Sequence, residues 1–352
     1  MFYDIINRKG QKLGISMKNK KEILRNILLF ITLIVITFVV IFHNNDFKQT
    51  INIILSVKFN YILLGIITMI FYFVLEALNI KNILKKLGNN ISIFSGIKYS
   101  LIGFFFSGIT PAATGGQPME IYYMKKEKIP VTHSTLALLL QLCSFHITTI
   151  ICGIIGLILN HQLLSKGFIW LFIVGLVFKA IALITMLICL FSQKLSRKIV
   201  NIFIKILEKI KFKNIEDTKQ KIDNSLKEYN QGSKFIKNNK KIFIQSLFIV
   251  LIQIIIYYTI PYFVYRSFNL IEYSIFKIIF IQAMLFVSAS SIPLPGSVGI
   301  SESAFISIYL AVFGTEKLAS ATLLNRGINF YLFVLIGFLV TLYSTLKQKK
   351  HI

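Results

Sequence analysis

Long apolar runs separated by short basic segments dominate this chain. A helix of about 20 apolar residues is long enough to cross the hydrocarbon core of a bilayer. Residues 129–165 and 242–265 contain no Lys, Arg, Asp or Glu. The pattern predicts an all-α polytopic membrane protein with six full spans, at residues 23–42, 59–80, 131–159, 167–191, 242–265 and 318–346.

Two further apolar segments, 91–124 and 274–313, are each interrupted by a stretch rich in Pro and Gly. The pieces beside each interruption are short for a full crossing. The interruptions read TPAATGGQPME (Thr110–Glu120) and IPLPGSVGISE (Ile292–Glu302), and in each a glutamate follows a proline by nine positions. We therefore predict two re-entrant helical hairpins. Two tilted full spans in each segment are the alternative, and they leave the other helices oriented in the same way.

The distribution of Lys and Arg predicts how the helices are oriented. Cytoplasmic loops of membrane proteins carry an excess of positive residues, and most of the 39 Lys and Arg fall in segments on one side. Both termini are then cytoplasmic, hairpin 91–124 enters from the inside, and hairpin 274–313 enters from the outside. Oppositely oriented hairpins in two halves are typical of an inverted-repeat architecture.

These elements make up a single transmembrane domain, 1–352. A basic cytoplasmic N-terminus, 1–25, precedes the first span, which we expect to be retained because no small-residue cleavage site follows it. The first half contains motif 110–120 and the second half contains motif 292–302. The two halves are residues 43–191 and 242–346.

Between the halves lies a basic cytoplasmic loop, 192–241, with 14 Lys or Arg against 5 Asp or Glu. Within it, apolar residues at helical spacing predict an amphipathic helix on the inner leaflet. The alternative is a solvated linker that contains one helix. The apolar residues are Ile199, Phe203, Ile206, Leu207 and Ile210.

Composition narrows the classes of function. A net charge of +25 is compatible with nucleic-acid binding, but its one-sided placement fits membrane orientation and attraction to anionic lipid better. The three cysteines lie in apolar spans and form no C-x-x-C motif or His/Cys cluster. The chain also lacks a P-loop, G-x-S-x-G and H-E-x-x-H. We therefore expect no nucleic-acid partner, metal, cofactor or catalytic residue.

The first interruption supplies one set of candidate residues for binding or translocation. Its paired glycines permit close backbone approach and a positive φ, and Pro118 suits the first position of a new helix, which puts Glu120 at the third. A helix that begins inside a membrane offers unpaired N–H groups and the positive end of its dipole to a phosphate or another anion. The candidates are Pro111, Gly115, Gly116, Gln117 and Glu120.

The second interruption predicts the same local structure. If Gly299 caps the following helix, Glu302 falls at its third position. Each glutamate then has two compatible interpretations: it caps its own helix, or it lies on a polar pathway, where it pairs with a cation or a headgroup amine or carries a proton. The candidates are Pro293, Pro295, Gly296, Gly299 and Glu302.

Arg326 lies inside the last predicted span and needs a partner there. Glu302 is one candidate, and an anionic lipid phosphate is the other, because the planar guanidinium binds phosphate through two hydrogen bonds. The alternative is that Arg326 pairs with Glu302 only to lock the hairpin. Second-rank candidates have ordinary explanations as well, namely snorkelling to the interface or packing. They are Glu76, Gln141, His146 and Asn325.

These residues carry a resemblance to a known family. TPAATGGQP followed by a glutamate and tyrosines, then PLPGSVGISE, then an arginine in the last span, resembles the lysylphosphatidylglycerol synthase transmembrane-region family. This family is the flippase-like membrane domain of the bacterial multiple peptide resistance factor. The resemblance covers roughly residues 20–346. It implies movement of lysyl-phosphatidylglycerol between leaflets, a link to antibiotic resistance, and roles by motif position for Glu120, Glu302 and Arg326.

The resemblance also implies an enzymatic alternative. Members with the full activity add a soluble acetyltransferase-like domain that makes the lipid from phosphatidylglycerol and lysyl-tRNA. No such domain follows the last predicted span, so we expect a stand-alone member that lacks the synthase. A phosphatidylglycerol lysyltransferase is the second hypothesis, and product formation by the purified protein would favour it.

The leading hypothesis is a lipid translocase of the bacterial cytoplasmic membrane. Its partner would be an anionic or aminoacylated phospholipid, held in a polar cavity between the inverted hairpins. A third hypothesis is a non-transporting subunit of an envelope glycolipid enzyme, which would show no activity in a reconstituted scrambling assay. A homodimer through lipid-facing spans is left open.

Overall fold

The computed structural model describes residues 46–163, 166–192, 215–290 and 294–349, together with single residues within 28–42 and 197–201. These parts of the chain are helical and contain no strand. The helices that form the bundle are α4 (Phe59–Lys86), α5 (Ile93–Ile109), α6 (Gly116–Lys126), α7 (Val131–Asn160), α8 (Lys166–Phe191), α11 (Lys240–Tyr258), α12 (Ile260–Ser267), α13 (Ile275–Ala289), α14 (Ile300–Arg326) and α15 (Leu332–Lys349). Two helices lie at its periphery, α3 (Phe47–Leu55) and α10 (Ile215–Asn238).

Five stretches of the described chain are helical, long and apolar enough to cross a membrane. Four of them match predicted spans at residues 59–86, 131–160, 167–191 and 240–267, and the fifth, 295–347, includes the last predicted span. The all-helical, multi-span prediction is therefore confirmed. Most of the first predicted span, 23–42, lies outside the described residues.

The two Pro/Gly interruptions break helices, as the sequence predicts. The first is the 3₁₀ turn η1 (Pro111–Ala113) between α5 and α6, and the second is η3 (Pro295–Ser297) between α13 and α14. The helices α5 and α13 have 17 and 15 residues, so they are about 26 and 22 Å long. Both are shorter than the roughly 30 Å hydrocarbon core of a bilayer.

The two broken helices also begin alike. Ser92 accepts a hydrogen bond from the Ser95 N–H at the start of α5, and Ser274 accepts one from the Lys277 N–H at the start of α13. Serine is a preferred N-cap because its hydroxyl satisfies an N–H group that has no partner within the helix. The resemblance between the halves thus extends beyond the interruptions to the caps that precede them.

The second hairpin does not end in a loop before the last span. Instead α14 runs on through residue 313 and turns at Gly314 (φ 69°, ψ 169°), and then continues toward α15. A five-residue π-helix, η4 (Gly327–Tyr331), joins α14 to α15. The expected segment 274–313 therefore ends at a glycine kink within a nearly continuous helical run.

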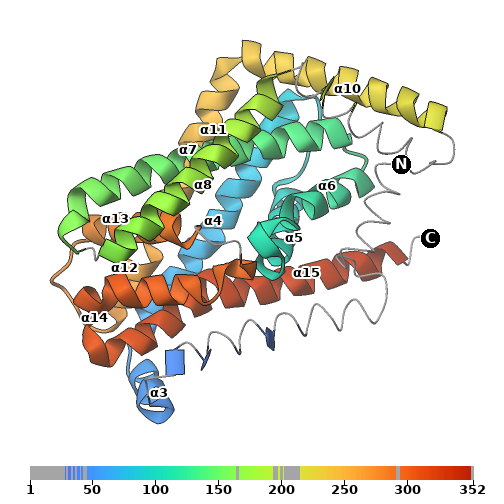
Figure 1. The fold of residues 1–352 in the computed structure, drawn as a ribbon. Helices are drawn as coiled ribbons and strands as arrows, with labels where there is room; N and C mark the ends of the chain where they lie inside the picture. The colour runs from blue at the N-terminus through green and yellow to red at the C-terminus, as the bar shows by residue number, and fades with distance from the viewer. Residues whose placement is uncertain are drawn as a thin grey trace.

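The helices pack side by side in one bundle (Figure 1), and contacts of the first half recur in the second. The helices that precede the hairpins, α4 and α11, pack on each other. The first helix of each hairpin packs along the helix that follows the other hairpin, α13 along α7 and α5 along α15. The two breaks, η1 and η3, are in contact. Each half therefore completes the core of the other, and the two interruptions touch each other.

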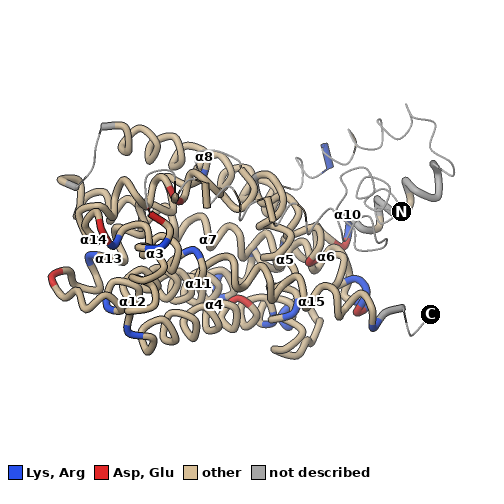
Figure 2. Tube along the Cα trace, turned by 90° about the horizontal axis from the view of Figure 1, so that it is seen from below, with Lys and Arg blue, Asp and Glu red and all other residues tan. Residues whose placement is uncertain are grey.

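Charged residues lie mostly toward the ends of the bundle (Figure 2). Few of them occur in the middle of the long helices, where the tube is almost entirely uncharged. The large apolar side chains exposed on α4, α7, α8 and α11 include Phe71, Ile158, Trp170 and Phe248. In a bilayer such residues would face the acyl chains, because lipid tails are as apolar as these side chains.

The basic loop between the halves forms one described helix, α10. Its Tyr229 and Ser233 hydroxyls donate to the backbone carbonyls of Cys189 and Leu190 at the end of α8. Glu228 of α10 lies 3.5 Å from His133 of α7. The predicted amphipathic helix around residues 199–210 lies outside the described residues, apart from Asn201. The described part of the loop is thus tied to the ends of α7 and α8.

Two glycines allow the crossings between the halves. A Cβ at Gly156 of α7 would lie 2.4 Å from the carbonyl oxygen of Phe280 in α13. A Cβ at Gly337 of α15 would lie 2.4 Å from the carbonyl oxygen of Leu101 in α5. Both distances are too short for a carbon and an oxygen in contact, so only glycine lets these backbones approach so closely.

We therefore predict that Gly156→Ala and Gly337→Ala each lower the free energy of unfolding by about 1–3 kcal/mol, because the added methyl group forces the helices apart. Thermal unfolding of the purified protein in detergent measures the effect. Gly167→Ala, at the start of α8 with nothing within 4 Å of the added Cβ, is the matched control. Unchanged melting temperatures in both variants would contradict the close helix crossings.

Candidate functional site

The second helix break holds a buried ion pair. Glu302 is 0% exposed, and its Oε1 accepts a hydrogen bond from Arg326 Nε at 2.7 Å. Its Oε2 accepts from the Gly299 N–H at 2.6 Å and from the Ser301 hydroxyl at 3.1 Å. The predictions that Glu302 is the third residue of its helix and that it pairs with Arg326 are both confirmed. The carboxylate therefore caps α14 and neutralises Arg326 at once.

Arg326 also ties this break to the last helix. Its Nη2 donates to the Gly296 carbonyl at 3.0 Å, and its guanidinium carbon lies 4.3 Å from the centre of the Phe330 ring. Among the described residues, its Nη1 makes no hydrogen bond. Phe330 belongs to the π-helix η4, an irregularity that often occurs at functional sites. The guanidinium therefore retains donor capacity for a further anionic group.

Positive φ angles in the second break occur at two glycines and at one serine. Gly296 has φ 57°, Ser297 has φ 50° and Gly299 has φ 86°. A Cβ at Gly296 would also collide with the Phe330 ring, at 2.3 Å. Pro295 begins the 3₁₀ turn and is half-buried, whereas Pro293 lies outside the described residues.

The first break differs from the prediction in two details. The helix α6 begins at Gly116, not at Pro118, so Glu120 is its fifth residue and not its third. The Gly115 backbone has φ −85°, and the positive φ falls on Ala113 (55°) instead. The reason is local: the Thr110 hydroxyl accepts a hydrogen bond from the Gly115 N–H at 2.9 Å, so the helix begins two residues earlier than predicted.

Close approach, by contrast, does require glycine in the first break. A Cβ at Gly116 would lie 2.0 Å from the Ser107 hydroxyl and 2.8 Å from the Gly103 carbonyl. Both clashes involve α5, against which α6 folds back. The paired glycines therefore let the two arms of the hairpin pack together. Beside them, Pro111 is exposed and Gln117 is half-buried.

The Glu120 carboxyl points into the bundle from α6. Its side chain is 5% exposed and lies against α5 at Gly103, where a Cβ would come within 2.0 Å of Oε1. Its Oε2 is buried and has no hydrogen-bond partner in the described part of the chain. Glu76 of α4 lies within electrostatic range of it. In contrast to Glu302, this glutamate has no counter-charge among the described residues.

Glu76 lies further from a helix end than the sequence suggests, and it is half-buried. The predicted span ended four residues after it, but α4 continues to Lys86. Its Oε1 accepts from the Gln141 amide at 2.9 Å, and its Oε2 lies 3.5 Å from the Gln253 amide. Two neutral donors from α7 and α11 thus hold this carboxyl inside the bundle.

Further polar residues extend this cluster between α4, α7 and α11. Asn79 donates to the Ser246 hydroxyl at 3.0 Å and lies 3.4 Å from the Gln141 amide oxygen. The hydroxyls of Ser246 and Ser144 are 2.9 Å apart. Hydrogen bonding allows polar groups to be buried in a low-dielectric interior. The sequence marked Gln141 as polar lining but gave no reason to join it to residues from two other helices.

Two tyrosines connect the acidic and basic parts of the interior. The rings of Tyr72 and Tyr257 lie 5.4 Å apart. Tyr72 is within electrostatic range of Glu76 and Glu120, and Tyr257 is within range of Arg326. Both tyrosines are only partly buried. We define the central polar cluster as Tyr72, Glu76, Glu120, Gln141, Gln253, Tyr257, Glu302 and Arg326.

The remaining second-rank candidates lie beside this cluster. His146 of α7 is half-buried, and its Nδ1 has no hydrogen-bond partner in the described chain. It is near Lys179 of α8, whose ammonium lies 4.8 Å from the centre of the Phe286 ring. Asn325 is 2% exposed and precedes Arg326, and its Oδ1 also lacks a partner among described residues.

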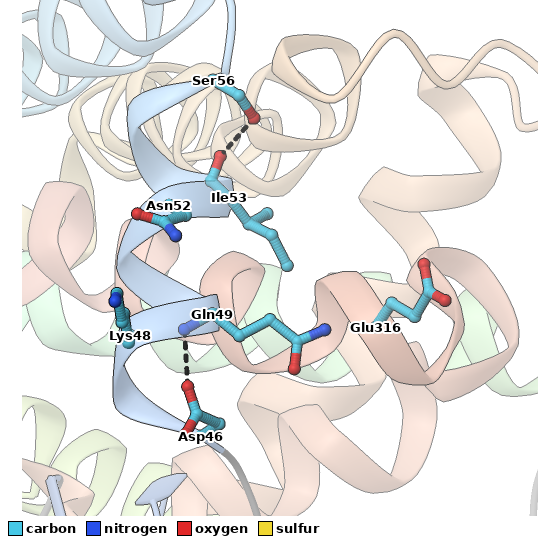
Figure 3. A pocket seen from close by; sticks show the side chains of 7 residues that line it. All are labelled: Asp46, Lys48, Gln49, Asn52, Ile53, Ser56 and Glu316. Atoms are coloured by element: carbon cyan, nitrogen blue, oxygen red, sulfur yellow. Dashed lines mark hydrogen bonds between the residues drawn. The ribbon is translucent and has the colours of Figure 1, made fainter.

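A separate open hollow lies at the end of the bundle where α3 meets α14 (Figure 3). Asp46 caps α3 by accepting a hydrogen bond from the Gln49 N–H at 2.7 Å. None of the candidate residues lines this hollow, so it is not part of the predicted site. Its lining residues are Asp46, Lys48, Gln49, Asn52, Ile53, Ser56 and Glu316.

Four members or neighbours of the cluster were not anticipated from the sequence, namely Tyr72, Gln253, Tyr257 and Phe330. Tyrosine, glutamine and phenylalanine occur throughout the apolar spans, so none of these positions stands out in the sequence. The available signal was weak: Gln253 is the one polar amide in a stretch, 247–256, that is otherwise apolar.

We predict that Arg326→Gln lowers the free energy of unfolding by about 3–5 kcal/mol, because it leaves the buried Glu302 carboxylate without its counter-charge. The double variant Glu302→Gln/Arg326→Gln should lose much less than the sum of the two single variants, since it removes both charges. Thermal unfolding of the four proteins in detergent measures the coupling. Additive effects would contradict a buried ion pair.

The comparisons with known proteins agree with this architecture. The chain is 22% identical over 317 residues to a UPF0104 membrane protein of Archaeoglobus fulgidus, and the match covers 88% of this chain and 94% of that protein. The model of a family described as the lysylphosphatidylglycerol synthase TM region matches residues 26–337. That range contains both helix breaks and the whole central polar cluster. The chain therefore belongs to the lysylphosphatidylglycerol synthase TM region family.

Proposed function

We propose that this protein is a flippase-like lipid translocase of the bacterial cytoplasmic membrane, which binds a phospholipid such as lysyl-phosphatidylglycerol through its headgroup. The observation that carries the proposal is the central polar cluster, which brings charges of both signs together where the two helix breaks meet. Charges inside a membrane are costly and usually mark a substrate or ion pathway. A zwitterionic or aminoacylated headgroup likewise combines an anion and a cation.

In this proposal the phosphate of the headgroup binds on the Arg326 side. Glu302, Gly296 and Phe330 hold the guanidinium in place, and its remaining N–H groups donate to the phosphate oxygens. The start of α14 adds the positive end of a helix dipole nearby. Since Glu302 already accepts three hydrogen bonds, we assign it to positioning Arg326.

The amine of a cationic headgroup binds on the opposite side of the cluster. Within the central polar cluster, Glu120 and Glu76 are the carboxyls without a basic partner in the described chain, and Tyr72, whose ring contacts Tyr257, lies within electrostatic range of both. An ammonium group is attracted both by a carboxylate and by the face of an aromatic ring. A headgroup that carries a positive charge is therefore favoured over phosphatidylglycerol itself.

We further propose that α5–α6 and α13–α14 are re-entrant hairpins inserted from opposite faces. Their short first helices, their matching breaks and the crossed packing of the halves support this arrangement. Irregular backbone is tolerated at membrane depth where it is buried in protein or lines a cavity. The acyl chains would stay in the bilayer while the headgroup passes between the two breaks.

We predict that purified protein in liposomes exchanges headgroup-labelled lysyl-phosphatidylglycerol between leaflets. Arg326→Gln should reduce the initial rate at least about tenfold, which corresponds to roughly 1.4 kcal/mol of lost interaction, because the phosphate loses its donor. Arg326→Lys should restore part of the rate, since it keeps the charge without the planar fork. Dye-labelled lipid reduced from outside the vesicles reports the rate.

Arg266→Gln is the matched control, because Arg266 lies beside Tyr61 at the end of the bundle and outside the cluster. Empty vesicles set the background. No exchange by the wild-type protein would favour a non-transporting membrane subunit. Aminoacyl lipid formed from lysyl-tRNA and phosphatidylglycerol by the same protein would favour the lysyltransferase.

A further inference from the structure

Glu76 is half-buried and Glu120 is buried, and neither carboxyl has a basic partner among the described residues. They lie within electrostatic range of one another, and neither forms an ion pair with a described Lys, Arg or His. Glu76 receives two neutral amide donors, whereas Oε2 of Glu120 receives none from any described residue. The ion pair of the second half therefore has no equivalent here.

The state in which both Glu76 and Glu120 are ionised is energetically unfavourable. A buried carboxylate without donors or a counter-charge costs several kcal/mol, and a neighbouring carboxylate adds to that cost. Two carboxyls that interact strongly take up and release protons as a pair rather than individually. The arrangement of donors indicates where the proton resides, because Glu76 is hydrogen-bonded as an acceptor and Glu120 is not.

The described charged groups around the pair bind other partners, so they do not neutralise the pair in place of this proton. Lys98 and Tyr99 of α5 bind Glu127 at the end of α6, and Arg326 is bound to Glu302. His133 of α7 faces Glu228 at the surface. Apart from these, the helices α4, α6, α7 and α11 carry the titratable side chains Tyr72, Tyr123, His146, Tyr257 and Tyr258, of which Tyr72 is within electrostatic range of both carboxyls.

A divalent metal is a poor alternative occupant. No group of three or more His, Cys, Asp or Glu side chains lies together among the described residues. The other side chains of the cluster within reach are amides and phenols, which suit Mg²⁺ or Zn²⁺ less well than carboxylate and imidazole sets do. A proton needs only one oxygen and no coordination shell.

We propose that Glu76 and Glu120 share a single proton, held mainly on Glu120, and exchange it for the ammonium group of a cationic lipid headgroup. The exchange conserves charge: the pair carries one negative charge with the proton bound. After the proton has left to water, two carboxylates and one ammonium again sum to one negative charge. This inference rests on the proposed function, and it makes movement of such a lipid dependent on protons.

The first experiment tests whether the protein holds this proton in the absence of lipid. We expect infrared difference spectra of the solubilised protein to contain the C=O band of a protonated carboxyl, which Glu120→Gln abolishes and Glu127→Gln retains. Glu127 is the matched control because it lies at the end of the same helix and is bound to Lys98. The absence of this band from the wild-type protein would overturn the inference whatever the protein does to lipid.

The exchange is tested by adding lysyl-phosphatidylglycerol to the solubilised protein in weakly buffered solution with a pH-sensitive dye. We expect the binding of each lipid molecule to release a single proton and to remove the carboxyl band. Phosphatidylglycerol is the control lipid, and it should cause neither change. Glu120→Gln should bind the lipid more weakly and release no proton, but it should keep its melting temperature, since an amide replaces a neutral carboxyl.

The outcomes separate this inference from the proposed function. A carboxyl band that disappears on lipid binding, without leaflet exchange in vesicles, would support the proton site and reject the translocase. Leaflet exchange without proton release would support the translocase and overturn the proton exchange. Release that depends on Na⁺ at constant pH would also overturn it, because the pair would then hold an alkali cation.

Discussion

Charge inside an apolar bundle must be balanced within the protein, and the Glu302–Arg326 pair is the contact on which the second half depends. One carboxylate caps a helix, accepts a hydroxyl and binds a guanidinium, and the guanidinium in turn binds the backbone of the break. Without water as an alternative partner, each of these bonds counts more than it would at a surface. The pair thereby fixes η3 to the last helix and keeps the backbone of the interruption satisfied.

The two halves share an architecture but not their electrostatics. Each has a serine-capped short helix, a Pro/Gly break and a buried glutamate. The helix that follows the first hairpin, α7, has no Lys or Arg, whereas the helical run after the second break contains Arg326. A repeated scaffold therefore presents an anion-binding end and an acidic end to the same interior. Such an asymmetry suits a ligand whose own charges are separated.

Neutral hydrogen bonds determine how the long helices meet. Glu76 and Asn79 of α4 bind Gln141 of α7, and Asn79 also binds Ser246 of α11. Apolar packing alone specifies the relative position of membrane helices weakly, because lipid tails compete equally well for apolar surface. The polar bonds select one arrangement of α4, α7 and α11. They also place Glu76 opposite the α5–α6 hairpin.

The sequence by itself determined the helical class, five of the spans and both helix breaks, since hydropathy and Pro/Gly content act locally. It named Glu302 as one of two candidate partners of Arg326, and the structure shows that pair. The sequence misplaced the start of α6, because the Thr110 hydroxyl, and not Pro118, sets that turn. It also placed Glu76 near the end of a span, because the apolar stretch stops before helix α4 ends. The central polar cluster was decided by tertiary structure alone. Glu76 is separated from Gln141 by 65 residues and from Gln253 by 177, and only the packing of the helices brings such distant residues together.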